Sequence, residues 1–411
     1  MHIDTKCIHA GGYPDTQTRG INTPIFTSSS HEYLDTDARL YQRYFNTPNQ
    51  EAVVKKICDL EGAEDGVVFS SGMAAISTVL LALLQSGDHA VVQDEIYGGS
   101  HAFIEEHFKR LGISFTLVRT DAQAIEDAVT LNTRLIYIES PTNPLLSVID
   151  LRQVAEIGKQ KGILTVIDNT FATPINQNPF CLGIDVVIHS GTKYLGGHSD
   201  LYCGVAITRK DLAARIRKVA TNLGGSLNAL SCYLLERSLK TLAIRVERQT
   251  RNALGISKFL ENHPKVAGVN YPGLESHSGH AIARNQMNGY GAMLSFELKD
   301  MTAQAFMKRL RLIKAALSLG GVETTICDPA TTSHQKVSSE VRKRLGISDN
   351  LLRLSVGIEN QDDLIEDIQQ ALEKEKAVSW EDSLRFFSAA WTLVFFLSLA
   401  LAGLGMVFRE Q

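Results

Sequence analysis

Apolar strands and amphipathic helices alternate along the chain from residue 49 to residue 208. Apolar residues recur at helical spacing over 49–60, and Gly62 follows as a stop signal. The pattern then predicts strands over 66–69, 89–93, 114–118, 134–139, 163–168, 184–189 and 203–208, with helices over 73–85, 121–130 and 150–161. Strands that are apolar throughout and separated by helices indicate an α/β fold whose mostly parallel sheet is covered on both faces. Ligands of such folds bind at the carboxyl ends of the strands.

The pattern changes in the last third of the chain. A long helix-compatible stretch over 227–262 stops at His263 and Pro264. Beyond it the sequence predicts strands over 291–298 and 351–357 and helices over 302–312 and 362–374, which is typical of a smaller α+β domain. We therefore expect an N-terminal arm over 1–48, a large domain over 49–250, a small domain over 251–376 and an extension over 377–411. The arm either contributes to a neighbouring subunit or is a frayed lead-in.

Composition excludes several classes of protein. The chain is 44% hydrophobic and 21% charged, as in ordinary folded proteins, and its net charge of −4 gives no sign of a nucleic-acid-binding surface. Its six cysteines form no C-x-x-C pair, which argues against a zinc site or a disulfide framework, so we expect no metal. No secretory signal opens the chain, and we expect a cytoplasmic enzyme or binding protein.

The densest group of chemically capable residues is HSGTKYLGGH at 189–198, directly after a predicted strand. Lys193, with the hydroxyls of Ser190 and Thr192 before it, suits a Schiff-base site, because a desolvated amine is nucleophilic and hydroxyls and backbone N–H groups hold a phosphate. A solvated loop lysine is the ordinary alternative. A serine acyl-enzyme with Ser190 and Lys193 at S-x-x-K spacing is another, but the companion motifs K-T-G and S-D-N do not occur in the chain.

Three other strand ends carry matching chemistry. Asp168 ends a strand and suits a protonated pyridine nitrogen, as in enzymes that use pyridoxal 5'-phosphate (PLP). The junction FSSGM at 69–73 places a glycine at the start of a helix, which suits a phosphate, and it is not a Walker loop. Tyr97 follows another strand and suits a planar ring. Each signal has a structural alternative, such as a helix cap or a tight turn, but together they favour a PLP site.

Six sequence blocks carry a family resemblance over residues 3–376. They are FSSGMA at 69–74, ESPTNP at 139–144, VIDNTFATP at 166–174, HSGTKYLGGHSD at 189–200, SLGGVE at 318–323 and LRLSVGIE at 352–359. In these blocks the chain resembles the Cys/Met-metabolism family of PLP enzymes, which includes cystathionine γ-synthase, cystathionine β- and γ-lyases, methionine γ-lyase and O-acetylhomoserine sulfhydrylase. The resemblance implies an aspartate-aminotransferase-like (fold type I) large domain, PLP as cofactor and a homo-oligomer of paired active sites, usually a tetramer.

The resemblance also implies roles for matching residues. Lys193 would bind PLP covalently and shuttle the substrate's α-proton, and Asp168 would hold the pyridinium nitrogen. Tyr97 would stack on the ring and take part in proton transfer, so the catalytic residues would be these three. The cofactor would also be bound by Gly72, Met73, Ser190, Thr192 and Thr170, with Tyr41 and Arg43 supplied by the neighbouring subunit. The substrate's α-carboxylate would be held by Asn143, Ser318 and Arg353, and a guanidinium fork matches a carboxylate.

The implied reaction is a γ-elimination that cleaves a carbon–sulfur bond in small sulfur amino acids such as cystathionine, homocysteine or methionine. The alternatives are γ-replacement, as in cystathionine γ-synthase or O-acetylhomoserine sulfhydrylase, and cystathionine β-lyase action. Sub-family features are mixed: Ala102 replaces an arginine of several relatives that handle cystathionine, whereas SLGGVE resembles the γ-type enzymes, and YFNTP at 44–48 departs from the family pattern. A non-catalytic binding module is disfavoured because Lys193 and Asp168 are present, and an aminotransferase matches the blocks less well.

The segment 386–408 has no charged residue. As a helix it would span about 34 Å, enough for a hydrocarbon core of about 30 Å. We expect either a C-terminal transmembrane helix that tethers the catalytic body on the cytosolic side or an accidental extension of the deduced sequence.

Overall fold

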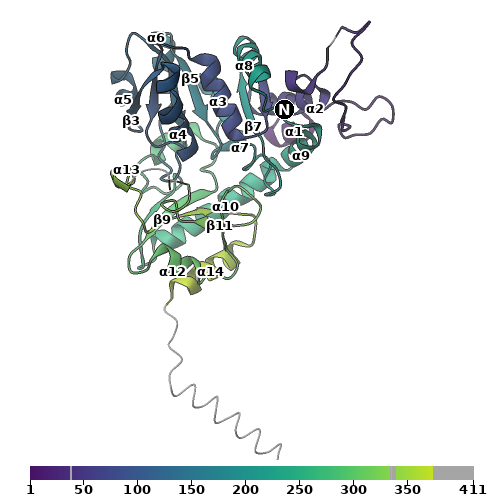
Figure 1. Ribbon diagram of the computed structural model, residues 1–411. Helices are drawn as coiled ribbons and strands as arrows, with labels where there is room; N and C mark the ends of the chain where they lie inside the picture. The colour runs from purple at the N-terminus through teal and green to yellow at the C-terminus, as the bar shows by residue number, and fades with distance from the viewer. Residues whose placement is uncertain (38, 334, 336–338, 374–411) are drawn as a thin grey trace, which may run out of the picture. The chain divides into compact units, whose positions relative to one another are not determined.

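The computed structural model describes residues 1–37, 39–333, 335 and 339–373 (Figure 1). It divides into two compact units, Met1–Ile368 and Gln369–Gln411. Both sheets and the cavity described below belong to the first unit.

The larger sheet has seven strands in the order β1-β7-β6-β5-β4-β2-β3. They are β1 (Asp65–Phe69), β2 (His89–Gln93), β3 (Ser114–Val118), β4 (Thr133–Glu139), β5 (Leu164–Asp168), β6 (Val186–His189) and β7 (Gly204–Thr208). Only β7 runs against its two neighbours, and the remaining pairs are parallel. The predicted α/β fold with a mostly parallel sheet is confirmed, and the sheet is mixed because of β7.

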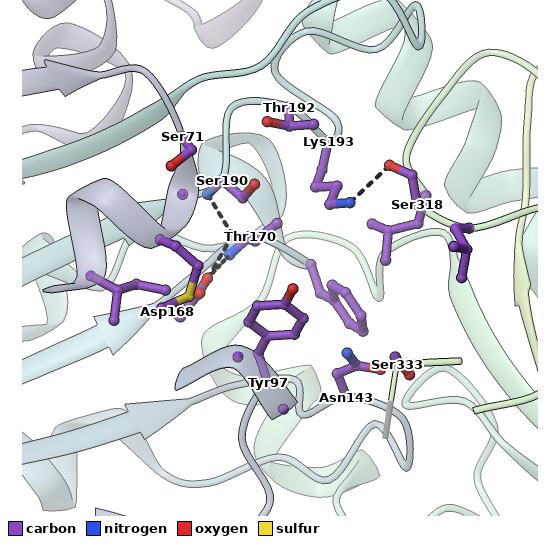
Figure 2. A pocket seen from close by; sticks show the side chains of 18 of the residues that line it. Ser71, Tyr97, Asn143, Asp168, Thr170, Ser190, Thr192, Lys193, Ser318 and Ser333 are labelled. Carbon is purple, nitrogen blue, oxygen red and sulfur yellow. Dashed lines mark hydrogen bonds between the residues drawn. The ribbon is translucent and has the colours of Figure 1, made fainter. Parts of the chain in front are cut away.

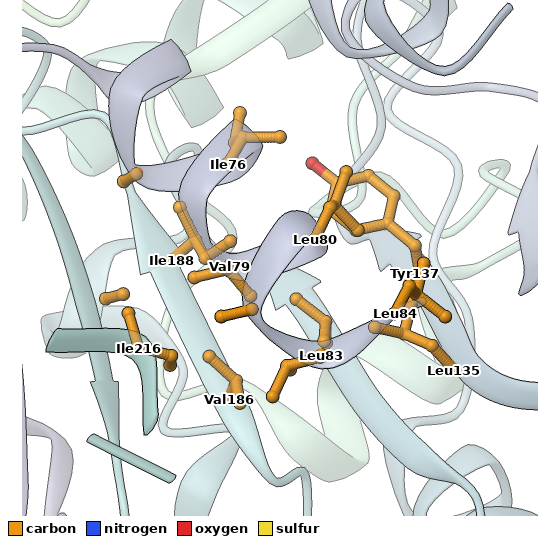
Figure 3. Packing of buried hydrophobic residues seen from close by; sticks show 14 of the residues in the cluster. Ile76, Val79, Leu80, Leu83, Leu84, Leu135, Tyr137, Val186, Ile188 and Ile216 are labelled. Atoms are coloured by element: carbon orange, nitrogen blue, oxygen red, sulfur yellow. The ribbon is translucent and has the colours of Figure 1, made fainter. Parts of the chain in front are cut away.

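Helices cover both faces of this sheet (Figure 1). One face carries α3 (Gly72–Leu83), α4 (Gly98–His107) and α8 (Lys210–Leu223), and the other carries α2 (Pro48–Glu61), α5 (Ala122–Asp127) and α6 (Leu151–Lys161). Figure 3 shows Val79, Leu80 and Leu83 of α3 packed over the strands, and all three are at most 3% exposed. Each such side chain contributes about 1.5–3 kcal/mol by burial, which fixes the start of α3 at the carboxyl edge of the sheet.

The start of α2 shows how local sequence sets an element. Thr47 and Gln50 form a capping box, with Pro48 at the first turn, and Gly62 ends the helix with a φ of 74°. The helix predicted over 49–60 corresponds to α2. The preceding residues contain α1 (Ile3–His9) and the short η1 (Gln42–Tyr44), and the chain between them extends away from the sheet (Figure 1).

The smaller sheet has five strands in the order β10-β11-β12-β9-β8. They are β8 (Val266–Asn270), β9 (Met293–Leu298), β10 (Lys314–Ala315), β11 (Thr325–Cys327) and β12 (Leu351–Ser355). The strands predicted over 291–298 and 351–357 correspond to β9 and β12, whereas β8, β10 and β11 are not in the predicted set. The remaining elements are α7 (Thr173–Asn176), α11 (His280–Gln286), α13 (Ser339–Arg344), α14 (Gln361–Leu372), η2 (Lys109–Leu111) and η3 (Phe180–Leu182).

Two predicted helices are wrong in extent. The stretch 227–262 is divided into α9 (Ala229–Leu239) and α10 (Leu242–Glu261), and at the break the Thr241 hydroxyl donates to the Ser238 carbonyl at 3.2 Å. The helix predicted over 302–312 is only α12 (Ala303–Met307). Beyond it the backbone N–H groups of residues 311–313 donate to the Asp367 carboxylate, and a helix would need those donors for its own carbonyls.

No helix in the described part of the chain is long and apolar enough to cross a membrane. The predicted transmembrane segment, 386–408, lies outside the described residues, so the membrane tether stays a prediction.

Candidate active site

A cavity of about 540 Å³ lies at the carboxyl ends of β4, β5 and β6, the edge that the fold predicts for a ligand. Among the predicted site residues, those that line it are Gly72, Met73, Tyr97, Asn143, Asp168, Thr170, Ser190, Thr192, Lys193, Ser318 and Arg353. Figure 2 shows most of them converging on one space. Tyr41 and Arg43 do not line it.

Lys193 lies in the turn that follows β6, and its amine faces the cavity (Figure 2). Its Nζ donates to the Ser318 hydroxyl at 2.8 Å. Burial lowers the pKa of this amine to about 8, and the positive charge of Arg353 acts in the same direction. The turn is held in place by Arg245, which is 4% exposed and donates to the Tyr194 carbonyl at 2.8 Å. A lysine in this state supplies a neutral, nucleophilic amine near neutral pH.

Asp168 is the last residue of β5 and is 6% exposed. Its Oδ1 accepts hydrogen bonds from Thr170, from the backbone N–H at 3.0 Å and from the hydroxyl at 2.5 Å. Burial raises the pKa of Asp168, whereas these hydrogen bonds and the charges of His189 and Lys193 lower it. The carboxyl group is thus prepared to pair with a cation inside the cavity.

An anion cradle lies at the start of α3, a helix of 12 residues. Ser71 caps this helix by accepting the Ala74 N–H, and a Cβ added at Gly72 would approach the Ser190 hydroxyl to 2.9 Å, so only glycine leaves room there. The Ser190 backbone is fixed by a 2.8 Å hydrogen bond to the Thr170 hydroxyl. The Thr192 hydroxyl lines the cavity but bonds the Cys203 backbone. A helix N-terminus with hydroxyls beside it suits a phosphate group.

Tyr97 lies before α4, and its ring faces the cavity, 40% exposed (Figure 2). Its backbone N–H donates to the Glu139 carboxyl at 2.8 Å. Glu139 also lines the cavity but is not among the predicted site residues. It ends a buried strand and opens the ESPTNP block, and these two features of the sequence could have indicated it.

On the other side of the cavity, Arg353 projects from β12 of the smaller sheet and is 4% exposed. Its Nη1 donates to the Asn143 amide oxygen at 2.7 Å. Ser318, in contact with Lys193, has a φ of 78°, a left-handed conformation that is uncommon for serine and is concentrated at functional sites. A guanidinium and two polar groups on one side of a cavity suit a carboxylate.

Tyr41 and Arg43 lie outside the cavity. The Arg43 guanidinium donates to the Thr221 carbonyl at 2.9 Å and stacks on Tyr41 at 5.4 Å. Their predicted role in a neighbouring subunit stays a prediction. The further lining residues that sequence reasoning missed include Ser71, Tyr202, Leu317, Thr332 and Ser333, all on loops or next to strand ends.

The donor set fits PLP, because an amine of lowered pKa, a buried acid and a helix N-terminus all line the same cavity. Together, the mixed sheet and this site define a PLP-dependent enzyme. A model of the "Cys/Met metabolism PLP-dependent enzyme" family matches residues 4–373. The chain belongs to this family.

Curated relatives agree with this assignment. The chain is 45% identical to cystathionine β-lyase of Coxiella burnetii, over 90% of this chain and 98% of that protein. It is 43% identical to cystathionine γ-lyase of Bacillus subtilis, over 91% of this chain and 100% of that protein. Among solved structures, cystathionine γ-lyase from Lactobacillus plantarum, in complex with L-serine, matches with a TM-score of 0.88 and 39% identity, over 90% of this chain and 98% of that one.

Proposed function

We propose that this enzyme cleaves the γ carbon–sulfur bond of small sulfur amino acids by elimination. The observation that carries the proposal is the Lys193 amine, held at 2.8 Å from Ser318 between an acid and a guanidinium. The acid, Asp168, suits the cofactor, and the guanidinium, Arg353, suits the α-carboxylate of an amino acid. An amine between these two groups would be suited to remove the α-proton of a substrate held by both.

When bound, PLP withdraws electrons from the α-carbon of an attached amino acid and so makes its α-proton removable. Lys193 would hold the cofactor, and the start of α3 with Ser190 and Thr192 would hold its phosphate. The Thr192 hydroxyl bonds the Cys203 backbone and the Thr192 N–H donates to the Cys203 carbonyl, so the hydroxyl would have to turn to reach the phosphate. Asp168 would keep the pyridine nitrogen protonated, and Tyr97 would stack on the ring.

Lys193 would act as a base whenever its amine is free. With its pKa at about 8, about a tenth of the amine is unprotonated at pH 7 and about half of it at pH 8. It would take the proton from Cα, and loss of a second proton from Cβ lets the γ-thiolate leave. Water then completes the reaction: cystathionine and water yield cysteine, 2-oxobutanoate and ammonia. Arg353, with Asn143, keeps the carboxylate fixed during these steps.

The second candidate is γ-replacement, in which a thiol takes the place of water, and the third is β-elimination. The SLGGVE block, which resembles that of the γ-type enzymes, favours a γ-reaction, and the Coxiella burnetii relative carries the name of a β-lyase. The products separate these reactions. γ-Elimination of cystathionine yields 2-oxobutanoate, whereas β-elimination yields pyruvate and homocysteine.

The test uses the full chain with PLP and measures oxo-acid release from L-cystathionine, L-homocysteine and L-methionine. We expect 2-oxobutanoate, and we expect Lys193→Ala to reduce its rate at least 10³-fold, because a general base contributes about 10²–10⁴ and the covalent link is also lost. Pyruvate as the main product from cystathionine would mean a β-lyase. Inertness of all three substrates, with thiol-dependent product from an O-acylated homoserine, would mean a synthase or sulfhydrylase.

Three further properties belong to this proposal. We infer a homo-oligomer in which Tyr41 and Arg43 complete the site of a neighbouring subunit. Sedimentation tests the oligomer, and complementation between differently mutated subunits tests the shared site.

We retain the large domain over 49–250 and the small domain over 251–376 as folding units. Limited proteolysis tests this division. We also retain 386–408 as a membrane tether, and recovery of the full-mass protein solely in the soluble fraction of its native cells would exclude it.

A further inference from the structure

Two buried carboxyl groups lie next to each other at the edge of the larger sheet. Glu139 and Asp168 end β4 and β5, are paired in parallel register and both line the cavity. They are 5% and 6% exposed. Asp168 has a role in the proposed function, whereas Glu139 has none. A buried carboxyl group is costly unless it is neutral or well paired, so Glu139 requires an explanation.

The surroundings of the two groups differ. Asp168 accepts two hydrogen bonds from Thr170, and the charges of His189 and Lys193 favour its ionised form. Burial raises the pKa of both groups, and the Asp168 carboxylate adds to the rise for Glu139, whose pKa lies well above its usual range. The N–H groups of Tyr97 and Asn143 and the charge of Arg353 lower that pKa.

Adjacent carboxyl groups in a dry site do not both ionise readily, and the one with better charge support loses its proton first. Here that one is Asp168, which leaves the proton on Glu139. A neutral Glu139 still offers an acceptor oxygen. Its Oε2 accepts the Tyr97 N–H at 2.8 Å, the contact that ties the loop before α4 to the end of β4.

The glycines after Tyr97 explain why this single contact matters. A Cβ at Gly98 would approach the Ser333 carbonyl to 2.6 Å, and one at Gly99 would approach the Tyr97 ring to 2.5 Å. The segment that carries Tyr97 is therefore closely packed against Ser333, and the Glu139 contact fixes it to the larger sheet. The position of the Tyr97 ring depends on both.

We propose that Glu139 is a positioning residue that holds Tyr97 against the cofactor as a neutral acid, so that Asp168 alone presents a negative charge to the pyridine nitrogen. This inference rests on the proposed cofactor placement between Tyr97 and Asp168. Glu139 acts through Tyr97 and takes no part in proton transfer.

The test compares Glu139→Gln, Glu139→Leu and Asp168→Asn in the full chain, with PLP affinity of the apoprotein and visible circular dichroism of bound PLP as readouts. Glutamine keeps a neutral group with an acceptor oxygen, so we expect an affinity within about twofold of the parent and an unchanged dichroism band. Leucine removes the acceptor. We expect it to weaken PLP binding about tenfold, the equivalent of one lost hydrogen bond, and to change the dichroism as the Tyr97 ring moves.

Each outcome decides a part of the proposal. A Glu139→Gln variant as defective as Asp168→Asn would overturn it, because Glu139 would then act as a charge. A Glu139→Leu variant with the parent's PLP affinity and dichroism would overturn the positioning role. If the leucine variant does not fold, Glu139→Met, whose side chain is unbranched, is measured in its place. An Asp168→Asn variant with parental cofactor properties would instead defeat the cofactor placement of the proposed function, so the two failures are distinguishable.

Discussion

The cavity has two walls that are built differently. The cofactor wall (Gly72, Tyr97, Asp168 and Ser190) lies at the strand ends and helix starts of the larger sheet. The substrate wall (Asn143, Ser318 and Arg353) joins the loop after β4 to β12 of the smaller sheet and to the loop between β10 and β11. Its central hydrogen bond, between Arg353 and Asn143, links residues 210 positions apart. Lys193 lies between the two walls and touches the second through Ser318.

The two walls are therefore expected to bind different molecules. Strand register fixes the cofactor wall, because Asp168 lies opposite Ile188 in β6 and opposite Glu139 in β4. The substrate wall depends on how the smaller sheet meets the larger one. We therefore expect substitutions in the cofactor wall to alter PLP affinity and substitutions in the substrate wall to alter KM. A substitution of Ser318, which contacts Lys193, should affect both quantities.

The largest effect in this comparison is expected from Asp168→Asn. It removes the charge that faces the pyridine nitrogen, and loss of one partner from a buried charge pair costs about 3 kcal/mol, or about 100-fold in PLP affinity. Equilibrium dialysis of the apoprotein measures it. Asp185→Asn is the matched control, because Asp185 pairs with Arg209 in a partly exposed bridge of the same sheet. If both variants bind PLP equally well, the cofactor wall is misassigned.

The cofactor wall was also the part most accessible from sequence. Asp168, Lys193 and Tyr97 each follow an apolar run that is recognisable as a strand, and the rule that ligands bind at carboxyl ends then groups them. The roles of Asn143, Ser318 and Arg353 came from family resemblance, because no local pattern indicates that residues so distant in sequence meet. The pairing of Glu139 with Asp168 depends on strand order, which a single sequence does not specify.

The errors in the fold have the same origin. Asp367 captures the N–H groups of residues 311–313 from 54 to 56 positions away, and this contact ends the predicted helix over 302–312. The strand β11 has only three residues, too few for a periodic pattern, and it is defined by its pairing with β12. Local sequence predicts elements that satisfy their own hydrogen bonds, and it fails where a distant side chain supplies the partner.

A smaller effect, confined to the substrate wall, is expected from Arg353→Lys. Lysine keeps the charge but loses the planar fork that holds a carboxylate and Asn143 together. We expect KM for the sulfur amino acid to rise about tenfold, or about 1.4 kcal/mol, with PLP affinity unchanged. Steady-state kinetics and dialysis measure the two quantities. Arg217→Lys, at the Asp65 bridge away from the cavity, serves as the control. A parallel loss of PLP affinity in Arg353→Lys would show that the walls are not separate.

The smallest effect is expected from Ser318→Ala, and it concerns pH. The Ser318 hydroxyl accepts a hydrogen bond from Nζ of Lys193 at 2.8 Å, which favours the protonated amine. The parent amine has a pKa of about 8, so the rate at which the apoprotein captures PLP should rise with pH up to about 8 and then level off, because the neutral amine is the nucleophile.

Removal of the hydroxyl withdraws support from the charged form, so the pKa of Lys193 should fall further and the midpoint of the capture-rate profile should move to lower pH by about one unit or less. Stopped-flow absorbance at several pH values measures this midpoint, and Thr332→Ala, on the same cavity with its hydroxyl donated to the Asp328 carbonyl, is the control. A midpoint that moves upward in Ser318→Ala would mean that the hydroxyl stabilises the neutral amine instead. The substrate wall would then activate Lys193 as well as orient the substrate, and the division between the two walls would no longer hold.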